Sequence, residues 1–330
     1  MKVAINGFGR IGRAILKIAL EKKINIVAIN DLHGIEDAAY LLKYDSIYGK
    51  YDKSIRTKGK NLIVDGKTIK VLSEPDPEKL PWKELSIDVV IESTGVFKDR
   101  ESASKHFIAG AEKVIITAPG KGNDITIVPG VNDNKLKKEY KIISVASCTT
   151  NASATVIKIL DDNFGIKEAL LNTVHAYTSS QALVDSSDKK HRMGRSAALN
   201  IVPTSTGASE AVCEVIPGLK GRINGLSIRV PVADGSLVDI TAQLKKPFNV
   251  EKINQVLKKS AKGKYKGIVE YSEEELVSSD IIGNEHSAII DSLMTQKEGS
   301  LVKVLAWYDN EYGYSSRVVD VINILKKFSK

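Results

Sequence analysis

Cys148 lies in a short stretch rich in hydroxyl groups, with Ser147 before it and two threonines after it. A strand-like apolar run at 141–145 precedes the stretch. Apolar residues then recur at helical spacing from 152 to 160, which predicts a helix that ends near Gly165. We therefore expect Cys148 at the N-terminus of a helix, directly after a strand.

The N-terminus of a helix carries unpaired N–H groups and the positive end of the helix dipole, so it favours an anion. We expect this setting to lower the pKa of the Cys148 thiol and to favour the thiolate, which is the nucleophile. The neighbouring hydroxyls would add donors for an oxyanion or a bound anion. The alternative is an inert cysteine, because most single cysteines are small, buried apolar residues.

His175 follows a strand-like run at 170–174 and is the candidate for a base beside the thiol. A cysteine paired with a histidine is a common form of activated nucleophile. The separation of the two residues along the chain does not establish a contact, however. A histidine at the end of a strand is often a structural hydrogen-bonding residue, and that alternative stays open.

Two further features predict anion binding. Arg229 lies between apolar neighbours in a predicted strand at 227–231, and an inward-facing guanidinium needs an anionic partner such as phosphate. The run at 203–207, which reads PTSTG, opens a predicted helix at 208–215, where hydroxyls and N–H groups could hold phosphate. An ordinary helix cap is the alternative for this second feature.

The beginning of the chain predicts a dinucleotide-binding βαβ unit. A strand at 3–6 leads into a Gly-x-Gly-x-x-Gly motif at 7–12, a helix follows, and a second strand at 26–30 ends at Asp31. The first two glycines permit a tight turn and close approach of a pyrophosphate, and the third lets helix and strand pack together. Asp31 would accept hydrogen bonds from ribose hydroxyls, which favours NAD. A tight turn without a ligand is the alternative.

Other predicted strands end at residues that could contact the same cofactor. A strand at 88–92 enters the turn at 93–95, and another strand ends at Thr117. Ligands gather at the carboxyl ends of strands in parallel α/β sheets, so we expect these residues, the glycine motif, Asp31 and Cys148 around one crevice. A nucleophilic cysteine beside a nicotinamide predicts oxidation through a covalent sulfur intermediate.

Length and composition limit the remaining possibilities. The 330 residues suffice for two domains, and two cysteines do not form a disulfide framework, so a reducing compartment is expected. No signal peptide precedes the strand-like run at Val3, and no apolar run reaches the length of about 18 residues that would predict a transmembrane helix. The net charge of +8 could serve nucleic acid binding, but the lysines are spread along the chain, which favours a solvated surface.

A long polar stretch at 179–200 and an aromatic cluster at 307–314 have no assigned role from spacing alone. Ordered connections of this length often serve binding or assembly. The aromatic cluster indicates a core or an interface. Cys213, inside the predicted helix at 208–215, is expected to be a core residue.

These features combine into motifs that span the whole chain. The motifs are INGFGRIGR (5–13), LLKYDS (41–46), ESTGVF (92–97), ASCTTN (146–151), HAYT (175–178), PTSTG (203–207) and WYDNEYGYSSRV (307–318). In order and spacing, they resemble the motifs of phosphorylating glyceraldehyde-3-phosphate dehydrogenases.

The resemblance implies an α/β protein with a Rossmann dinucleotide-binding domain at 1–147, on which a C-terminal helix at 315–330 packs. It implies an α+β catalytic domain at 148–314 with a largely antiparallel sheet that mediates contacts in a homotetramer, and a loop at 179–200 that reaches a neighbouring subunit's cofactor site. The implied activity is the oxidation of glyceraldehyde 3-phosphate to 1,3-bisphosphoglycerate with NAD and inorganic phosphate, in glycolysis or gluconeogenesis. The implied location is the cytoplasm, with no membrane or nucleic acid partner required.

The resemblance also assigns roles to individual residues. Cys148 is the nucleophile and His175 the base, while Asn310 would bind the nicotinamide carboxamide and Tyr314 would lie behind the ring. No metal site is expected. The implied substrate and phosphate contacts are Ser147, Thr149, Thr178, Arg192, Thr206, Gly207 and Arg229, with Thr178 and Arg229 on the C3 phosphate. The implied cofactor contacts are Gly7, Phe8, Gly9, Arg10, Ile11, Gly12, Asp31, Ser93, Thr94, Gly95, Thr117, Asn310 and Tyr314.

Some positions depart from the family pattern. Pro75 stands where many bacterial members have an arginine near the adenine, so that contact is not expected here. Ser186 and Ser187 replace the Leu-Pro pair of strictly NAD-using bacterial members and resemble the NADP-tolerant plastid type, whereas Asp31 favours NAD. We expect NAD as the cofactor, with NADP use as an open alternative.

Three rival functions stay open. Erythrose-4-phosphate dehydrogenase shares the Cys–His core, although its relatives usually lack the HAYT and TSTG patterns present here. A nucleic-acid- or surface-binding protein with incidental catalysis would use the +8 charge, and its RNA binding would depend steeply on salt. A non-phosphorylating aldehyde dehydrogenase would not need two anion sites.

Overall fold

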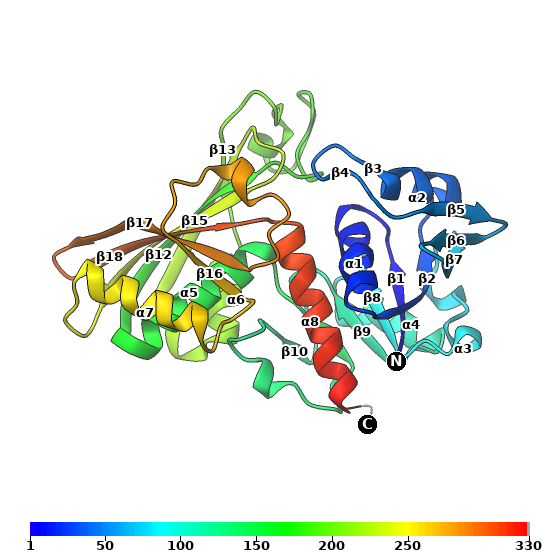
Figure 1. Ribbon diagram of the computed structural model, residues 1–330, viewed down its shortest axis with the longest axis horizontal. Helices are drawn as coiled ribbons and strands as arrows, with labels where there is room; N and C mark the ends of the chain where they lie inside the picture. The colour runs from blue at the N-terminus through cyan, green and yellow to red at the C-terminus, as the bar shows by residue number, and fades with distance from the viewer. Residues whose placement is uncertain (329–330) are drawn as a thin grey trace. The chain divides into compact units, whose positions relative to one another are not determined.

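The structure, a computed structural model, describes residues 1–328, which divide into two units (Figure 1). Unit 1 contains Met1–Ile127, Asn134–Ala146 and the chain from Ser315 onward. Unit 2 contains Val128–Asp133 and Ser147–Tyr314. The short segment Val128–Asp133 therefore belongs with the second unit, which no sequence pattern indicated.

Unit 1 is built on a nine-stranded sheet with the order β10-β11-β9-β8-β1-β2-β7-β6-β5. The strands from β10 to β7 pair in parallel, and β6 and β5 complete the sheet as antiparallel strands. The strand order reverses beside β1, with β2 on one side and β8 on the other, which is the switch point where such sheets bind ligands. The strands are β1 (Lys2–Asn6), β2 (Asn25–Asn30), β5 (Ile55–Lys58), β6 (Asn61–Val64), β7 (Lys67–Leu72), β8 (Val89–Glu92), β9 (Lys113–Ile116), β10 (Ile125–Thr126) and β11 (Ile142–Ser144).

Apolar packing fixes the helices of unit 1 on this sheet. Trp82 is fully buried and packs with Ala4 and Val90, so α3 covers β1 and β8. Ala103 packs on Val114 and holds α4 against β9. Burial of a large apolar side chain contributes about 1.5–3 kcal/mol. The helices are α1 (Arg10–Glu21), α2 (Gly34–Lys43), α3 (Trp82–Leu85) and α4 (Arg100–Ile108), and a small hairpin joins β3 (Tyr44–Asp45) to β4 (Gly49–Lys50).

Unit 2 is built on a seven-stranded sheet with the order β13-β14-β12-β15-β18-β17-β16. Most neighbours are antiparallel, and the parallel pairs are β12 with β14 and β16 with β17, so the predicted α+β architecture is confirmed. Helix α5 packs on β12, β15, β17 and β18, with α6 and α7 beside it. The strands are β12 (Ile166–Ala176), β13 (Val202–Ser205), β14 (Ile223–Val230), β15 (Ser236–Leu244), β16 (Val269–Ser272), β17 (Ala288–Glu298) and β18 (Leu301–Tyr308). The helices are α5 (Cys148–Phe164), α6 (Ala208–Val215), α7 (Val250–Lys262) and α8 (Tyr312–Phe328), the last of which passes into unit 1 at Ser315.

Local turn chemistry accounts for the hairpin between β6 and β7. Asp65 and Gly66 have φ of 48° and 81°, the left-handed conformation that a two-residue hairpin between β6 and β7 requires. Strand β10 has only two residues and ends at Thr126. Within residues 1–328, no helix combines the length and the apolar character needed to cross a membrane.

Candidate active site

Cys148 is the first residue of α5, directly after the turn that follows β11. Ser147 caps this helix, because its hydroxyl accepts the Thr150 N–H at 3.1 Å. Ala146 has φ of 53°, a conformation that is unfavourable for a residue with a side chain. The helix ends at Phe164 before Gly165, as the sequence predicts.

His175, on the penultimate position of β12, reaches Cys148 from another element. Its Nε2 lies 3.5 Å from Cys148 Sγ, which is hydrogen-bonding range for sulfur. His175 is 4% exposed, so bulk water does not compete for this contact. This contact favours a thiol–imidazole pair. It speaks against a purely structural role for His175 and against an inert Cys148.

The other nitrogen of His175 is held by the main chain. Nδ1 lies 2.7 Å from the carbonyl oxygen of Ala176, so an Nδ1–H donates there and Nε2 is left to accept the thiol proton. Arg229 Nη1 also approaches Nδ1, at 3.1 Å, but the same atom donates to Ala176 O at 3.1 Å, which leaves the tautomer with Nδ1–H intact. This is the tautomer that a base toward Cys148 needs.

Burial sets the protonation of this pair, and the sequence-based expectation for the thiol was wrong. Burial raises the pKa of the Cys148 thiol, against the lowering by Arg229 and by the Thr149 N–H. Burial and, to a smaller extent, the Arg229 cation together lower the pKa of His175 to about 3. His175 is thus neutral near pH 7 and can accept a proton when sulfur attacks.

Tyr308, at the end of β18, completes the surroundings of His175 and was not singled out from sequence. Its hydroxyl bonds to those of Thr149 at 2.9 Å and Thr173 at 2.8 Å. Its ring meets the His175 ring edge-on, with centroids 6.0 Å apart. Burial raises the pKa of Tyr308 above its usual range, so the residue is a neutral hydrogen-bonding support. The aromatic cluster at 307–314 was the signal that could have found it.

Arg229 lies next to His175 on β14, at the paired position of the register. Its Nη1 donates to the Thr178 hydroxyl at 3.4 Å, and that hydroxyl also bonds to Ser180 at 2.8 Å. Arg229 Nε is buried without a hydrogen-bond partner among residues 1–328. A half-buried guanidinium with an unused donor, beside a threonine hydroxyl, can bind an anion such as phosphate.

In unit 1, the glycine motif forms the turn between β1 and α1 and touches the end of β8. Gly7 has φ of 92°, and a Cβ there would lie 2.6 Å from Thr94 N. A Cβ on Gly12 would lie 2.2 Å from Gly7 O, so a side chain at either position would displace the main chain. The Ser93 hydroxyl donates to Gly7 O at 2.6 Å and joins the two turns.

The N-terminus of α1 is open to an anion. Gly9 stands at the cap without a side-chain cap, no acidic residue lies in the first turn, and nothing lies within 4 Å of a Cβ on Gly9. Asp31 accepts the Phe8 N–H at 2.8 Å and the His33 N–H at 3.1 Å. Burial would raise the pKa of Asp31, but these hydrogen bonds outweigh it and lower the pKa, so Asp31 is a carboxylate at the end of β2.

Comparisons with known proteins agree with this geometry. Residues 1–100 match the family model "Glyceraldehyde 3-phosphate dehydrogenase, NAD binding domain", and residues 147–310 match the C-terminal domain of that family. The chain is 53% identical to glyceraldehyde-3-phosphate dehydrogenase of Thermotoga maritima, over 99% of both chains. It is 52% identical to that of Borreliella burgdorferi, over 99% of this chain and all of the relative.

The chain belongs to the glyceraldehyde-3-phosphate dehydrogenase family.

Asn310, the residue that the family resemblance assigns to the nicotinamide, is oriented by a residue that sequence reasoning missed. Ser236 accepts the Ala176 N–H at 3.1 Å and donates to Asn310 Oδ1 at 2.7 Å. The Asn310 amide is thereby fixed with its oxygen toward Ser236, which leaves the NH₂ group to donate elsewhere. Tyr314, in the first turn of α8, is 4% exposed, and burial raises its pKa.

The residues that the family resemblance assigns to inorganic phosphate are only partly brought together. The Thr206 hydroxyl accepts the Ala208 N–H at 3.1 Å, and Gly207 stands at the cap position of α6, which packs beside α5. Arg192 lies exposed in a short 3₁₀ helix at His191–Gly194. No contact within residues 1–328 joins it to Cys148, so its role stays a prediction.

Several predicted cofactor residues of the family already have partners within unit 1. Arg10 forms an ion pair with Asp45 at 2.7 Å. The Thr94 hydroxyl bonds to the Glu92 carboxylate, and the Thr117 hydroxyl donates to Glu92 O at 3.1 Å. Ile11 is half-buried in α1, and Gly95 is exposed with φ of 73°. The Thr94 and Thr117 hydroxyls therefore help to fix the turns that follow β8 and β9.

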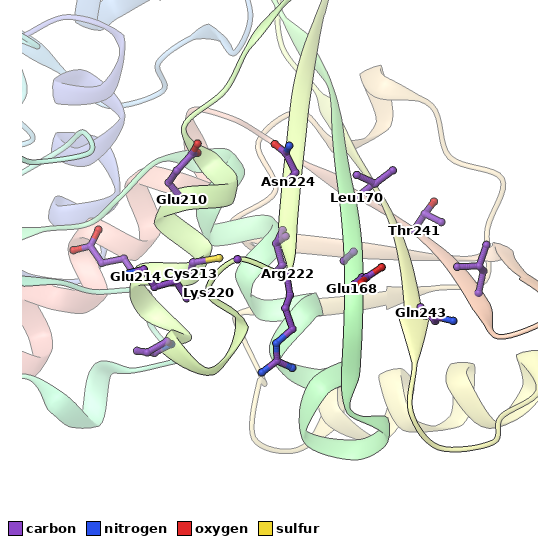
Figure 2. A pocket seen from close by; sticks show the side chains of 15 residues that line it. Glu168, Leu170, Glu210, Cys213, Glu214, Lys220, Arg222, Asn224, Thr241 and Gln243 are labelled. Carbon is purple, nitrogen blue, oxygen red and sulfur yellow. The ribbon is translucent and has the colours of Figure 1, made fainter.

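A cavity of about 1160 Å³ lies elsewhere on unit 2 and contains none of the predicted site residues (Figure 2). It is bordered by α6 and by β12, β14 and β15. Cys213 lines it and donates its thiol to Leu219 O at 3.4 Å. Cys213 is half-buried rather than in the core, because the side of α6 that carries it faces this cavity.

Proposed function

We propose that this protein oxidises glyceraldehyde 3-phosphate to 1,3-bisphosphoglycerate, with NAD as hydride acceptor and inorganic phosphate as second substrate. The observation that carries the proposal is the contact of 3.5 Å between Cys148 Sγ and His175 Nε2, beside the Arg229 guanidinium. The family relationship supports an NAD-dependent dehydrogenase over the rival functions.

The residues of unit 1 fit a bound NAD. The uncapped N-terminus of α1 and the space above Gly9 suit the pyrophosphate, and the Asp31 carboxylate suits ribose hydroxyls. NAD supplies one piece of chemistry, acceptance of a hydride. We propose that Gly7–Gly12, Asp31, Ser93–Gly95 and Thr117 hold it, and that the Asn310 amide holds its carboxamide.

The first step uses the neutral His175. Cys148 Sγ attacks the aldehyde carbon, and its proton passes through His175 Nε2 to the carbonyl oxygen, which gives a hemithioacetal. Arg229 and Thr178 bind the C3 phosphate and hold the aldehyde in position, which lowers the entropic part of the barrier. The N–H groups at the start of α5 stabilise the developing oxyanion.

In the second step His175 takes the hydroxyl proton while the carbon loses its hydride. This leaves a thioester on Cys148 and an imidazolium. Inorganic phosphate, bound by Ser147, Thr149, Arg192, Thr206 and Gly207, attacks the thioester carbon. The acyl phosphate leaves, and Cys148 recovers its proton from His175.

The decisive assay follows absorbance of reduced nicotinamide when the purified protein meets glyceraldehyde 3-phosphate and NAD, with and without phosphate. Sustained reduction that requires phosphate and is lost in Cys148→Ser supports the proposal. Sustained turnover without phosphate would show that water accepts the acyl group instead. An absence of reduction would contradict the main claim and would direct the test to erythrose 4-phosphate.

We further propose a homotetramer in the cytoplasm, with the Rossmann domain at 1–147 and the catalytic domain at 148–314. Exposed leucines on the sheet of unit 2, among them Leu170, Leu226 and Leu301, support burial of that face between subunits. Light scattering at micromolar concentration tests the assembly. The ratio of kcat/KM for NAD and NADP tests whether Ser187 permits dual use.

A further inference from the structure

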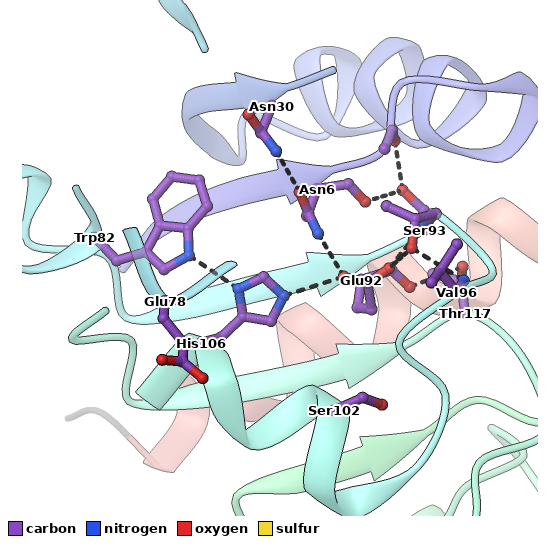
Figure 3. A network of polar contacts seen from close by, with 12 residues as sticks. Asn6, Asn30, Glu78, Trp82, Glu92, Ser93, Val96, Ser102, His106 and Thr117 are labelled. Atoms are coloured by element: carbon purple, nitrogen blue, oxygen red, sulfur yellow. Dashed lines mark hydrogen bonds and ion pairs between the residues drawn. The ribbon is translucent and has the colours of Figure 1, made fainter. Parts of the chain in front are cut away.

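Three buried polar residues lie in register at the carboxyl ends of β2, β1 and β8. Asn30 is paired with Asn6, and Asn6 with Glu92. Asn30 Nδ2 donates to Asn6 Oδ1 at 2.7 Å, and Asn6 Nδ2 donates to Glu92 Oε2 at 2.6 Å. Figure 3 shows this row crossing the strands. We call it, with the two residues described next, the buried polar row.

The buried polar row continues into the helices that cover the sheet. His106 of α4 meets Glu92 Oε2 through Nε2 at 3.0 Å, and Trp82 of α3 donates its indole N–H to His106 Nδ1 at 3.0 Å. An indole nitrogen can only donate, so Nδ1 accepts and the proton of neutral His106 lies on Nε2. His106 therefore donates to Glu92, and Trp82 fixes that tautomer.

Each oxygen of the Glu92 carboxylate accepts two hydrogen bonds. Its Oε2 accepts from Asn6 and His106, and its Oε1 accepts the Thr94 N–H at 2.8 Å and the Thr94 hydroxyl. Four donors match the four lone-pair positions of a carboxylate. A glutamine at 92 would turn its NH₂ group toward one of these pairs and leave a buried donor without an acceptor.

The same residues hold the two turns that shape the dinucleotide site. The Gly7 N–H donates to Asn30 O, and the Ser93 N–H donates to Asn6 O, each at 2.8 Å. The Thr94 hydroxyl, which donates to Glu92, also accepts the Val96 N–H at 3.1 Å. The turn at 93–96 is therefore attached to the sheet through Glu92, and the glycine turn through Asn6 and Asn30.

We infer that Glu92 is a positioning residue for the cofactor: through Thr94 it fixes the turn at 93–96, and so the glycine turn against it, in the shape that receives NAD. This inference rests on the proposed function, since it concerns the same dinucleotide site. Glu92 is 2% exposed and faces inward, so it acts through Thr94 and does not touch the ligand.

The test is Glu92→Gln, measured by isothermal titration with NAD and by steady-state kinetics. We expect the Kd and KM for NAD to rise about tenfold, because a hydrogen bond between Thr94 of the turn and the buried carboxyl group is lost. We expect kcat at saturating NAD and KM for glyceraldehyde 3-phosphate to stay within about twofold. Glu78→Gln is the matched control, because it removes the same charge from an exposed position on unit 1.

Thr94→Val provides a second test on an exposed residue whose replacement leaves the core intact. It removes the hydroxyl from Glu92 and should raise the Kd for NAD by roughly threefold to tenfold. In the double variant the two effects should not add, because both act through the same bond.

Three results would overturn the inference: a wild-type Kd for NAD in folded Glu92→Gln, a reduced binding stoichiometry with unchanged Kd, or additive effects in the double variant. If Glu92→Gln does not fold, the Kd of Thr94→Val decides, and an unchanged value rejects the inference. Failure of the wild-type protein to bind NAD would instead reject the proposed function, so the two failures are distinguishable.

Discussion

The two candidate sites place buried carboxyl groups in different surroundings. In unit 1, the Glu92 carboxylate accepts four hydrogen bonds, and each of its partners acts as a donor. In unit 2, Asp309 accepts the Gly283 and Tyr312 N–H groups at 2.7 and 2.6 Å, but it also hydrogen-bonds to the carboxyl group of Asp234. Two carboxyl groups can bond to each other only when one keeps a proton, so the arrangement around Asp309 depends on pH.

The two sites also differ in whether their polar groups have hydrogen-bond partners. Each member of the buried polar row has a partner, whereas Arg229 Nε in unit 2 has none among residues 1–328. A site that binds a dinucleotide through main-chain turns benefits from being rigid before the ligand arrives. A site that binds a charged substrate and moves protons keeps donors and acceptors available, at a cost in stability. Four substitutions test this contrast.

Cys148→Ser should have the largest effect. The hydroxyl is a far weaker nucleophile than sulfur at this position, so kcat should fall roughly 10⁴-fold or more. Steady-state NAD reduction measures it. Cys213→Ser is the matched control and should keep wild-type kcat, since Cys213 lines a separate cavity. Equal losses in both variants would mean that the thiol at 148 is not the nucleophile.

His175→Asn should lower kcat about 10²–10⁴-fold, because the proton acceptor for both the thiol and the hemithioacetal is lost. The rate of Cys148 alkylation by iodoacetamide at pH 7 should fall as well. NAD affinity should not change, because His175 is not among the proposed NAD contacts. Normal alkylation with reduced kcat would separate the two roles of the imidazole and would limit it to the hydride step.

Arg229→Ala should raise KM for glyceraldehyde 3-phosphate roughly 10–100-fold, since a charge-assisted hydrogen bond to phosphate is lost. Unphosphorylated glyceraldehyde is the control substrate, and its kcat/KM should change much less. A similar loss with both substrates would mean that Arg229 supports His175 and Thr178 but does not bind the C3 phosphate.

Asp234→Asn should have the smallest effect, on stability. Burial raises the pKa of Asp309 above its value in the unfolded chain. The stability that the shared proton contributes is therefore complete below the unfolded pKa of about 3.9 and is lost as the pH rises through the folded pKa. An asparagine amide at position 234 donates at any pH, so the thermal midpoint at pH 8 should rise by about 2 °C, corresponding to about 1 kcal/mol.

The difference between the midpoints of Asp234→Asn and wild type should shrink at pH 5. Asp52→Asn is the control, because it removes the same charge from a side chain that is 76% exposed and should leave the midpoint unchanged at both pH values. A pH-independent shift in Asp234→Asn would mean that the two carboxyl groups do not share a proton.

The local features of the fold follow from short stretches of sequence. The glycine turn and the start of α5 at Cys148 depend on periodicity and turn chemistry within a few residues, and the structure has both as predicted. The hairpin at Asp65 and Gly66 follows from the same kind of local turn chemistry. The row of Asn30, Asn6 and Glu92 also stands at predicted strand ends, but nothing in a single strand states which strand lies beside it.

The chemistry of those features depends on tertiary structure. His175 meets Cys148, Tyr308 meets Thr149 and Ser236 orients Asn310 across separations of 27, 159 and 74 residues, which no local pattern encodes. The pKa of Cys148 shows the consequence most clearly. The helix terminus predicts a lowered value, but the protein packed around the sulfur raises it, because desolvation depends on every element that comes to surround an atom and not on its neighbours in the chain.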